Sequence, residues 1–341
     1  MRSTPLRAVV LSALLLVLGT QHAAAAAPPD FVTSDGQTAA VSTPGDAADD
    51  PAIWVDHADP ARSLVIGNNK LGALETYDLA GRLVQRISDA KQFWGNVDVR
   101  GNLVATYHDG GVRIFKVDAS TRRLSNVTEG GVVPTSGEGL CLYRAPRGDL
   151  HVFIIARSSP SLTRQYELTD ADSDGLFAGK LRRTFDVGSE AEGCVVDDHN
   201  GALYVSEEDV ALWRYGAEPA SGATRVAVGH LRKGVGSRLK ADLEGVTLAG
   251  DRIIVSVQST GTAYRSYFAV YDRTTNAYVG AFRVTKGANS DDCDGTDGVA
   301  AYAGYLGPRF PDGLFVCQDQ HNQSPTANQN FKLVRWDRLP D

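Results

Sequence analysis

The pentapeptide EGCVV at residues 192–196 returns as EGVTL at residues 244–248, and this acid-then-apolar phrase decides the fold. Related phrases stand at four other places, which begin at Asp50, Asp98, Glu138 and Asp297. The steps between successive acids are 48, 40, 54, 52 and 53 residues. Because self-similarity at a period of this length is typical of repeat architectures, we expect six structural units in series.

Each unit continues with two further apolar runs that are rich in Val, Ile, Leu, Tyr and Phe. The second runs are residues 63–67, 103–106, 151–156, 202–206, 252–257 and 313–317. The third runs include residues 74–79, 112–117, 163–168, 211–215, 267–271 and 332–336. Gly, Asp and Asn separate these runs, which is the pattern of strands and turns, and the absence of a long 3.6-residue period predicts few helices.

Six units of three or four strands predict an all-β fold, and a six-bladed β-propeller better than a sandwich. The last unit shows only three clear strands before Asp341. We expect the stretch from about Val32 to Val41 to supply the fourth strand and close the ring, which leaves only short, protected edges. Residues 27–341 would then form a single domain.

The N-terminal segment has the pattern of a processing signal. Arg2 and Arg7 precede the apolar run 8–18, and the small-residue tract 23–27 offers cleavage sites. The apolar run is too short for a bilayer-spanning helix, which needs roughly 20 residues. Residues 1–26 are therefore predicted to be a signal peptide, and the mature chain is expected to be secreted or periplasmic, with no membrane attachment.

Composition and charge exclude some classes of protein. Of the 341 residues, 43% are hydrophobic and 22% are charged, which is a globular balance. The formal net charge is −7, and loss of Arg2 and Arg7 would bring the mature chain to about −9. An acidic surface repels a phosphate backbone, so a nucleic-acid partner is disfavoured. An anionic substrate would meet the same repulsion unless cations intervened.

The four cysteines are Cys141, Cys194, Cys293 and Cys317. In an oxidising compartment an even number permits two disulfides, and four cysteines allow three pairings. Their spacing does not choose among these pairings. We interpret the cysteines as structural, because none has a neighbouring His or a C-x-x-C partner.

The repeated acids are expected to meet at one place. In a propeller the first strand of each blade lines the central channel, and here the second strands end in polar clusters on one face. These clusters are residues 68–70, 107–109, 207–209, 258–259 and 318–320. Oxygen donors in this number suit Ca²⁺, which takes about six to eight of them, whereas zinc or copper would favour His and Cys. The alternative is purely structural: acid–glycine pairs that shape bends at the blade edges.

A separate acidic motif is DADSDG at residues 170–175, which has the form of the opening of a calcium loop. The twelfth position of an EF-hand loop would be Leu181 instead of Glu, so the motif is not an EF-hand. A calcium loop in a hairpin and a polar turn are both compatible with this sequence.

The phrases together resemble the β-propeller phytases, the calcium-dependent alkaline phytase family. The resemblance is carried by DDPAIWV (49–55), NNK (68–70), YDL (77–79), NVD (96–98), EGCVVDD (192–198), EED (207–209), DLEG (242–245), DGTDG (294–298) and QD (318–319). It extends from about Asp49 to Trp336, and the order of the phrases is more specific than any one of them. It implies a six-bladed propeller and stepwise hydrolysis of phytate (myo-inositol hexakisphosphate), with several Ca²⁺ ions bridging enzyme and phosphates.

By matched position, the resemblance implies roles for individual residues. The implied metal ligands are Asp49, Asp50, Asn96, Asp98, Glu192, Glu208, Asp242, Glu244, Gln258, Asp291, Asp297 and Asp319. The implied catalytic, water-activating residues are Glu192, Asp242, Glu244 and Asp297. The implied substrate-binding positions are Lys70, Arg157 and Glu138.

The chain departs from the family pattern among the expected phosphate contacts. Leu71 stands where the family often has a second lysine, and Tyr107 and His108 stand near a family arginine. Glu138 takes the place of a substrate-contacting tyrosine, and Arg157 is the cation nearest to a family lysine. These departures bear on affinity and rate more than on fold or metal binding.

Three hypotheses of function follow. The leading one is a secreted, monomeric, calcium-dependent phosphomonoesterase that hydrolyses phytate by metal-activated attack of water, without a phospho-enzyme. The second is a calcium-propeller lactonase or esterase, a chemistry that usually needs one or two channel metals and a His or Asp base. The third is a non-catalytic binding propeller that calcium stabilises.

Overall fold

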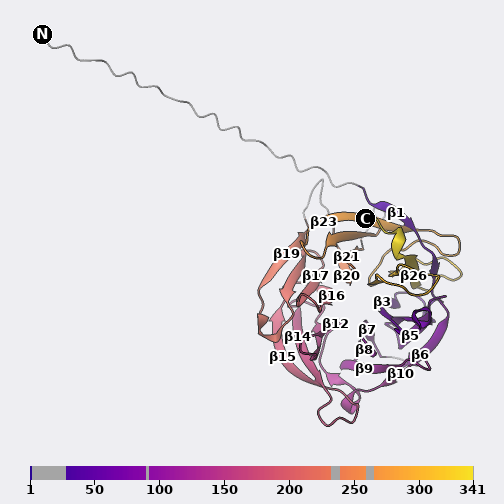
Figure 1. Cartoon of the computed structure of the whole chain (residues 1–341), viewed down its shortest axis with the longest axis horizontal. Helices are drawn as coiled ribbons and strands as arrows, with labels where there is room; N and C mark the ends of the chain where they lie inside the picture. Colours follow the sequence, from indigo (N-terminus) through magenta and orange to yellow (C-terminus); the bar gives the residue numbers. More distant parts are fainter. Residues whose placement is uncertain (2–27, 90–91, 232–238, 259–264, 341) are drawn as a thin grey trace.

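The computed structural model describes residues 1, 28–89, 92–231, 239–258 and 265–340. Its strands form six sheets arranged in a ring around a central axis (Figure 1). The helical elements of the described residues are four short 3₁₀ helices: η1 (Pro60–Arg62), η2 (Glu129–Gly131), η3 (Pro219–Ser221) and η4 (Trp336–Arg338). The prediction of an all-β, six-bladed propeller with few helices is confirmed.

The first three blades follow one another in sequence. The first contains β3 (Ala48–Trp54), β4 (Leu64–Asn69), β5 (Ala73–Asp78) and β6 (Leu83–Ser88). The second contains β7 (Trp94–Arg100), β8 (Leu103–His108), β9 (Gly111–Asp118) and β10 (Arg123–Asn126), and β11 (Val133–Pro134) also pairs with β9. The third contains β12 (Gly139–Arg144), β13 (Leu150–Ile155), β14 (Leu162–Thr169) and β15 (Ala178–Asp186).

The other three blades complete the ring. The fourth contains β16 (Ala191–Asp197), β17 (Ala202–Glu207), β18 (Ala211–Gly216) and β19 (Arg225–His230). The fifth contains β20 (Leu243–Ala249), β21 (Arg252–Val257), β22 (Tyr267–Asp272) and β23 (Tyr278–Thr285). The sixth contains β24 (Val299–Tyr302), β25 (Leu314–Asp319) and β26 (Asn330–Arg335). The first strands contact one another in the cyclic order β3, β7, β12, β16, β20, β24 and β3 again.

The N-terminal segment closes the ring, as predicted. Strand β2 (Gly36–Gln37) pairs antiparallel with β26 and becomes the fourth strand of the sixth blade. Strand β1 (Asp30–Thr33) adds a contact that was not expected, because it pairs parallel with β23 at the outer edge of the fifth blade (Figure 1). The N-terminal chain therefore joins two blades, and it gives the last blade the strand that the repeat lacks.

The hydrophobic core is divided among the seams between neighbouring blades. All six residues of β4 and of β13 are buried, in keeping with the apolar runs at residues 64–66 and 152–155. At the seam between the last and first blades, Val65 and Tyr77 share a cluster with Phe331 and Leu333. Each such side chain contributes about 1.5–3 kcal/mol when it is fully buried, so this apolar seam holds the ring together.

The structure resolves the pairing that cysteine spacing left open. The disulfides are Cys141–Cys194, between the first strands of the third and fourth blades, and Cys293–Cys317, within the sixth blade region. Disulfides are typical of proteins outside the reducing cytoplasm. No helix among the described residues has the length and hydropathy needed to cross a bilayer. The predicted signal peptide lies, apart from Met1, outside the described residues.

Candidate metal centre and active site

The acids at the channel mouth stand on irregular starts of the first strands. The pairing between first and second strands shifts register at residues 48–51, 94–97, 191–194 and 243–246. A β-bulge leaves residues unpaired and changes the direction of their side chains. Asp49, Glu192 and Glu244 lie within these irregular segments. The carboxylates of these three acids therefore lie outside the regular strand pairing, at the end of the channel where the first strands begin.

The glycine after the acid has a structural reason of its own. A Cβ atom on Gly193 would lie 2.2 Å from the carbonyl oxygen of Glu244 in the next blade. A Cβ atom on Gly298 would lie 2.4 Å from the Cα atom of Asp50. Neighbouring first strands approach so closely here that only glycine fits. Where a phrase has a glycine after its acid, that glycine is required by the close packing of neighbouring first strands.

Two overlapping groups of carboxylates form the candidate metal centre. In each group, one oxygen atom from each of three residues lies within 4.8 Å of the others. The groups are Asp49, Glu138 and Glu192, and Glu192, Glu208 and Glu244. Glu192 is only 7% exposed and belongs to both groups. We call these five residues, together with Asp297, the acidic mouth.

Burial and mutual repulsion raise the pKa of several carboxyls in the acidic mouth. Burial, reinforced by the charge of Asp49, raises the pKa of Glu192 well above its ordinary value. Burial raises the pKa of Glu208 to about 7, and the nearby Glu190 adds to the shift. Burial also raises the pKa of Asp297 to about 7. A cation placed among these carboxyls would relieve the repulsion.

Lys70 lies among the carboxylates, and its implied role in substrate binding stays a prediction. Its Nζ atom is 3.2 Å from Asp49 Oδ1, 3.2 Å from Asp297 Oδ2 and 3.1 Å from Asp46 Oδ1. Burial opposes its charge, but these carboxylates outweigh burial and raise the pKa of Lys70 above its ordinary value. The side chain is 12% exposed, so most of it is buried among these acids.

Two further predicted residues lie at the rim. Arg157 Nη1 is 3.4 Å from Glu138 Oε1, and Arg157 Nε is 3.1 Å from Glu190 Oε1. The Arg157 side chain is 54% exposed, so part of it faces solvent at the rim. Asp242 lies beside Asp209, and burial followed by the Asp209 charge raises the pKa of Asp242.

Gln258 contacts the site through its amide nitrogen. Its Nε2 atom donates to Asp297 Oδ1 and, at 3.5 Å, to the carbonyl oxygen of Gly295. Because Lys70 occupies the other oxygen of Asp297, both oxygens of this carboxylate have partners. The described geometry therefore shows Gln258 orienting Asp297, and a metal-ligand role for Gln258 stays a prediction.

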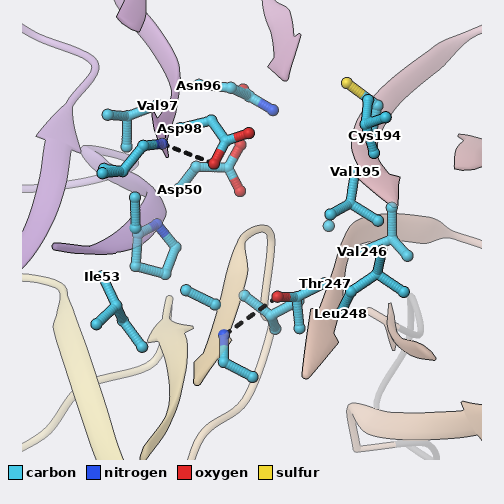
Figure 2. Close-up of a pocket in the computed structure, with 18 of the residues that line it drawn as sticks. Asp50, Ile53, Asn96, Val97, Asp98, Cys194, Val195, Val246, Thr247 and Leu248 are labelled. Atoms are coloured by element: carbon cyan, nitrogen blue, oxygen red, sulfur yellow. Dashed lines mark hydrogen bonds between the residues drawn. The ribbon is translucent and has the colours of Figure 1, made fainter. Parts of the chain in front are cut away.

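Below the mouth, the channel holds a cavity of about 400 Å³. Asp50, Asn96 and Asp98 lie on one wall, across from Val246 and its neighbours in the fifth blade (Figure 2). Asn96 is 3% exposed, and its Oδ1 atom has no hydrogen-bond partner among the described residues. A buried amide oxygen without a partner is available to a ligand inside the channel.

The carboxylate of Asp98 is hydrogen-bonded to groups outside the acidic mouth. Arg100 Nη1 lies 3.0 Å from each of its carboxylate oxygens. The backbone N–H groups of Val99 and Leu142 donate to the same carboxylate at 2.7 and 2.9 Å. These four contacts from three donor groups satisfy Asp98, so its implied role as a metal ligand has no support from the geometry.

Asp291 and Asp319 lie around a buried lysine instead of at the acidic mouth. Lys332 Nζ contacts Asp291 Oδ1 and lies 2.8 Å from Asp319 Oδ2. The side-chain oxygens of Asn322 and Asn330 accept from the same Nζ at 2.8 Å each. Lys332 is fully buried. Lys332 therefore compensates part of the charge of this pair of acids within the protein, and their metal-ligand role also stays a prediction.

The DADSDG loop lies apart from the acidic mouth. One carboxylate oxygen each from Asp170, Asp172 and Asp174 lies within 4.8 Å of the others. Gly175 N donates to Asp170 Oδ2 at 3.0 Å, and Leu176 N donates to Asp174 Oδ1 at 2.8 Å. These backbone contacts are those of a polar turn, and calcium binding by the loop stays a prediction.

The structure adds four residues to those that the resemblance implied. They are Asp46, Asn68, Glu190 and Gln318. Asp46 contacts Lys70, Glu190 contacts Arg157, and the two amide side chains hold the backbone of the mouth. Asn68 and Gln318 stood in the polar strand ends that the sequence marked. Asp46 and Glu190 precede the repeated phrases, and no periodic signal includes them.

The donor set of the acidic mouth fits calcium. In both described groups every donor is a carboxylate oxygen, and neither contains His or Cys. The unpartnered Oδ1 atom of Asn96 adds a neutral oxygen donor nearby. Carboxylate and amide oxygens are the ligands that Ca²⁺ prefers, whereas zinc and copper select imidazole and thiolate.

Fold and site together define a class: a six-bladed β-propeller whose channel mouth gathers carboxylates around one lysine. The chain belongs to the phytase family, because the family model "Phytase" matches residues 2–341. The 3-phytase of Bacillus subtilis (strain 168) is 32% identical over 333 residues, which cover 90% of this chain and 84% of that protein. The predicted membership of the β-propeller phytases is confirmed, and the chain is an enzyme of the phytase type. This favours the phosphatase hypothesis over a lactonase or a binding module.

Proposed function

We propose that this chain is an exported, monomeric phytase that removes phosphates from phytate stepwise with calcium ions held at the acidic mouth. The observation that carries the proposal is Glu192, a buried carboxylate shared by two groups of three acids. Phytate is a polyanion and the mouth is acidic, so direct contact would be repulsive without cations between them. The family assignment and the 3-phytase relative support phytate as substrate.

Each group of acids would hold one ion. Asp49, Glu138 and Glu192 would bind the first, and Glu192, Glu208 and Glu244 the second. A bound calcium ion would polarise phosphoryl oxygens and lower the pKa of coordinated water. Glu192 would link the two sites, so that its loss affects both.

The other residues of the mouth would position the substrate and handle protons. Lys70 would donate a charge-assisted hydrogen bond to a phosphate oxygen, and Arg157 would swing from Glu138 and Glu190 toward a second phosphate. Asp297, whose pKa is about 7, is able to exchange a proton at Oδ1 or Oδ2 near neutral pH. Gln258 and Lys70 fix the orientation of that carboxylate. Asp242 would act at the rim beside Asp209.

The test is phosphate release from phytate by the purified mature chain. We expect turnover in millimolar Ca²⁺, loss of nearly all turnover after EGTA treatment, and recovery when Ca²⁺ is restored. Magnesium at the same concentration serves as a control for ionic strength and for general divalent effects. Undiminished phosphate release in excess EGTA would contradict the calcium requirement while leaving the phytase assignment intact.

A further inference from the structure

Gln318 is a buried side chain to which the proposed chemistry gives no role. It is 0% exposed and lies in β25, at the seam where the sixth blade meets the first. Its Nε2 atom donates to the carbonyl oxygen of Ala48 at 3.1 Å, and its Oε1 atom accepts from the backbone N–H of Asp297 at 2.9 Å. Ala48 directly precedes Asp49. One amide group therefore ties the backbones of two acids across the seam.

We propose that Gln318 is a positioning residue for the candidate metal centre, setting the separation of Asp49 and Asp297. The inference rests on the proposed calcium function of the acidic mouth. The side chains of these two acids both lie 3.2 Å from Lys70 Nζ. Asp49 and Asp297 belong to the first and sixth blades and are far apart in sequence, so local sequence does not fix the distance between their carboxylates. The Gln318 amide supplies this connection at the level of the backbone.

A similar pair of amide hydrogen bonds occurs at the other side of the first blade. Asn68, like Gln318, is the fifth residue of its blade's second strand. Its Nδ2 atom donates to the carbonyl oxygen of Trp94 in the second blade at 2.7 Å, and its Oδ1 atom accepts from the N–H of Asp50 at 2.9 Å. The equivalent residues of the other four blades are Tyr107, Ile154, Ser206 and Ser256. The two amides thus flank the one blade that carries Asp49, Asp50 and Lys70.

A purely structural role for Gln318 would be to close the ring, and the chain offers a matched control for it. Gln165, in β14, is also 0% exposed. Its Nε2 atom donates to the carbonyl oxygen of Ala217 at 2.9 Å, across the seam between the third and fourth blades. Ala217 follows β18 at the end of the blade opposite the acidic mouth. Gln165 therefore shares burial and cross-seam bonding with Gln318 but has no contact with the acids.

The experiment compares Gln318→Met with Gln165→Met in the full mature protein. The readouts are the Ca²⁺ concentration that gives half of the maximal rise in melting temperature, and kcat/KM for phytate at saturating Ca²⁺. Both variants should melt below the wild type in EGTA, because Gln318→Met loses two buried hydrogen bonds and Gln165→Met loses one. Only Gln318→Met should raise the half-maximal Ca²⁺ concentration, by about ten-fold, as loss of outer contacts to metal ligands does. Only that variant should lose kcat/KM to a similar extent.

A second variant keeps the test decisive if Gln318→Met does not fold. Gln318→Asn retains the amide but is one methylene shorter, so it can hold Asp297 or Ala48 and not both. A folded Gln318 variant that titrates with Ca²⁺ like the wild type and like Gln165→Met would overturn the positioning role. If the wild type itself shows no response to Ca²⁺, the proposed metal centre fails, and the inference fails with it. The two failures are thus separate observations.

Discussion

Replacing Glu192 by Gln should change stability in opposite directions with and without calcium. The amide keeps the shape of the side chain and removes one charge from the centre of two carboxylate groups. Unit charges 4.8 Å apart repel by about 3 kcal/mol at an effective dielectric constant of about 20, and partial protonation of the acids reduces the net repulsion. We therefore expect the metal-free variant to be more stable than the wild type by about 1–3 kcal/mol.

With calcium the sign reverses. A ligand at a thousand times its Kd stabilises the native state by about 4 kcal/mol, and weakening its Kd a hundred-fold removes about 2.7 kcal/mol of this. Because Glu192 belongs to both groups of acids, the loss applies at two sites and amounts to about 5 kcal/mol, which exceeds the metal-free gain of about 1–3 kcal/mol. At about 2 °C per kcal/mol for a chain of this size, Glu192→Gln should melt a few degrees above the wild type in EGTA and several degrees below it in millimolar Ca²⁺. Phytate turnover by the variant should fall to a small fraction of that of the wild type.

The assay is a pair of melting curves in EGTA and in Ca²⁺, with phytate turnover measured on the same preparations. Glu129→Gln is the matched control, because it removes the same charge from an exposed site in η2, away from the acidic mouth. The control should leave the Ca²⁺ increment unchanged. An increment in Glu192→Gln equal to that of the wild type, or wild-type turnover, would refute the shared-ligand role of Glu192.

Three further predictions follow from particular residues. The raised pKa values of Glu208 and Asp297, both about 7, mean that the folded state holds protons that the unfolded state has lost. The stability of the metal-free protein should therefore fall as pH rises from about 4 to about 7. The rise in melting temperature that Ca²⁺ causes should grow over the same pH range, because the ligands must lose their protons to bind the ion. A calcium-induced rise that does not depend on pH would count against these residues as ligands. The pKa of Asp197 is shifted in the opposite direction. Burial raises this pKa, but hydrogen bonds, led by the one from Arg273, outweigh burial and lower it to about 2. Asp197→Asn should therefore cost about 2 kcal/mol of unfolding free energy in urea at pH 7, and progressively less as pH falls from about 4 to about 2. Lys70→Ala should lower kcat/KM for phytate at least ten-fold, the worth of a charge-assisted hydrogen bond, while calcium still raises the melting temperature; unchanged kinetics would place the phosphate contact elsewhere.

The sequence predicted the ring because the fold is periodic. Acids such as Glu192 and Glu244 recur at nearly constant spacing, and each begins a strand whose neighbours are also repeated. Blade number, strand order and the place where the acids meet follow from that repetition together with the general geometry of propellers. The closing strand was predictable for the same reason, since a missing fourth strand in the last unit leaves an open edge.

Contacts between segments far apart in sequence were not predictable in this way. Asp291 is implied as a metal ligand by its place in the sequence, but in the fold it forms an ion pair with Lys332 of β26. A lysine on the third strand of the last blade carries no sign, in one sequence, of which acids it meets. The disulfide pairing likewise depends on which first strands are neighbours, which the spacing of cysteines does not encode.

The most direct test of the account is a crystal structure of the mature protein in millimolar Ca²⁺, with anomalous scattering used to locate the ions. We predict one calcium peak bounded by Asp49, Glu138 and Glu192, and another bounded by Glu192, Glu208 and Glu244. Calcium found only at loop 170–175, or an acidic mouth in which Lys70 is the sole cation at saturating Ca²⁺, would contradict the central claim.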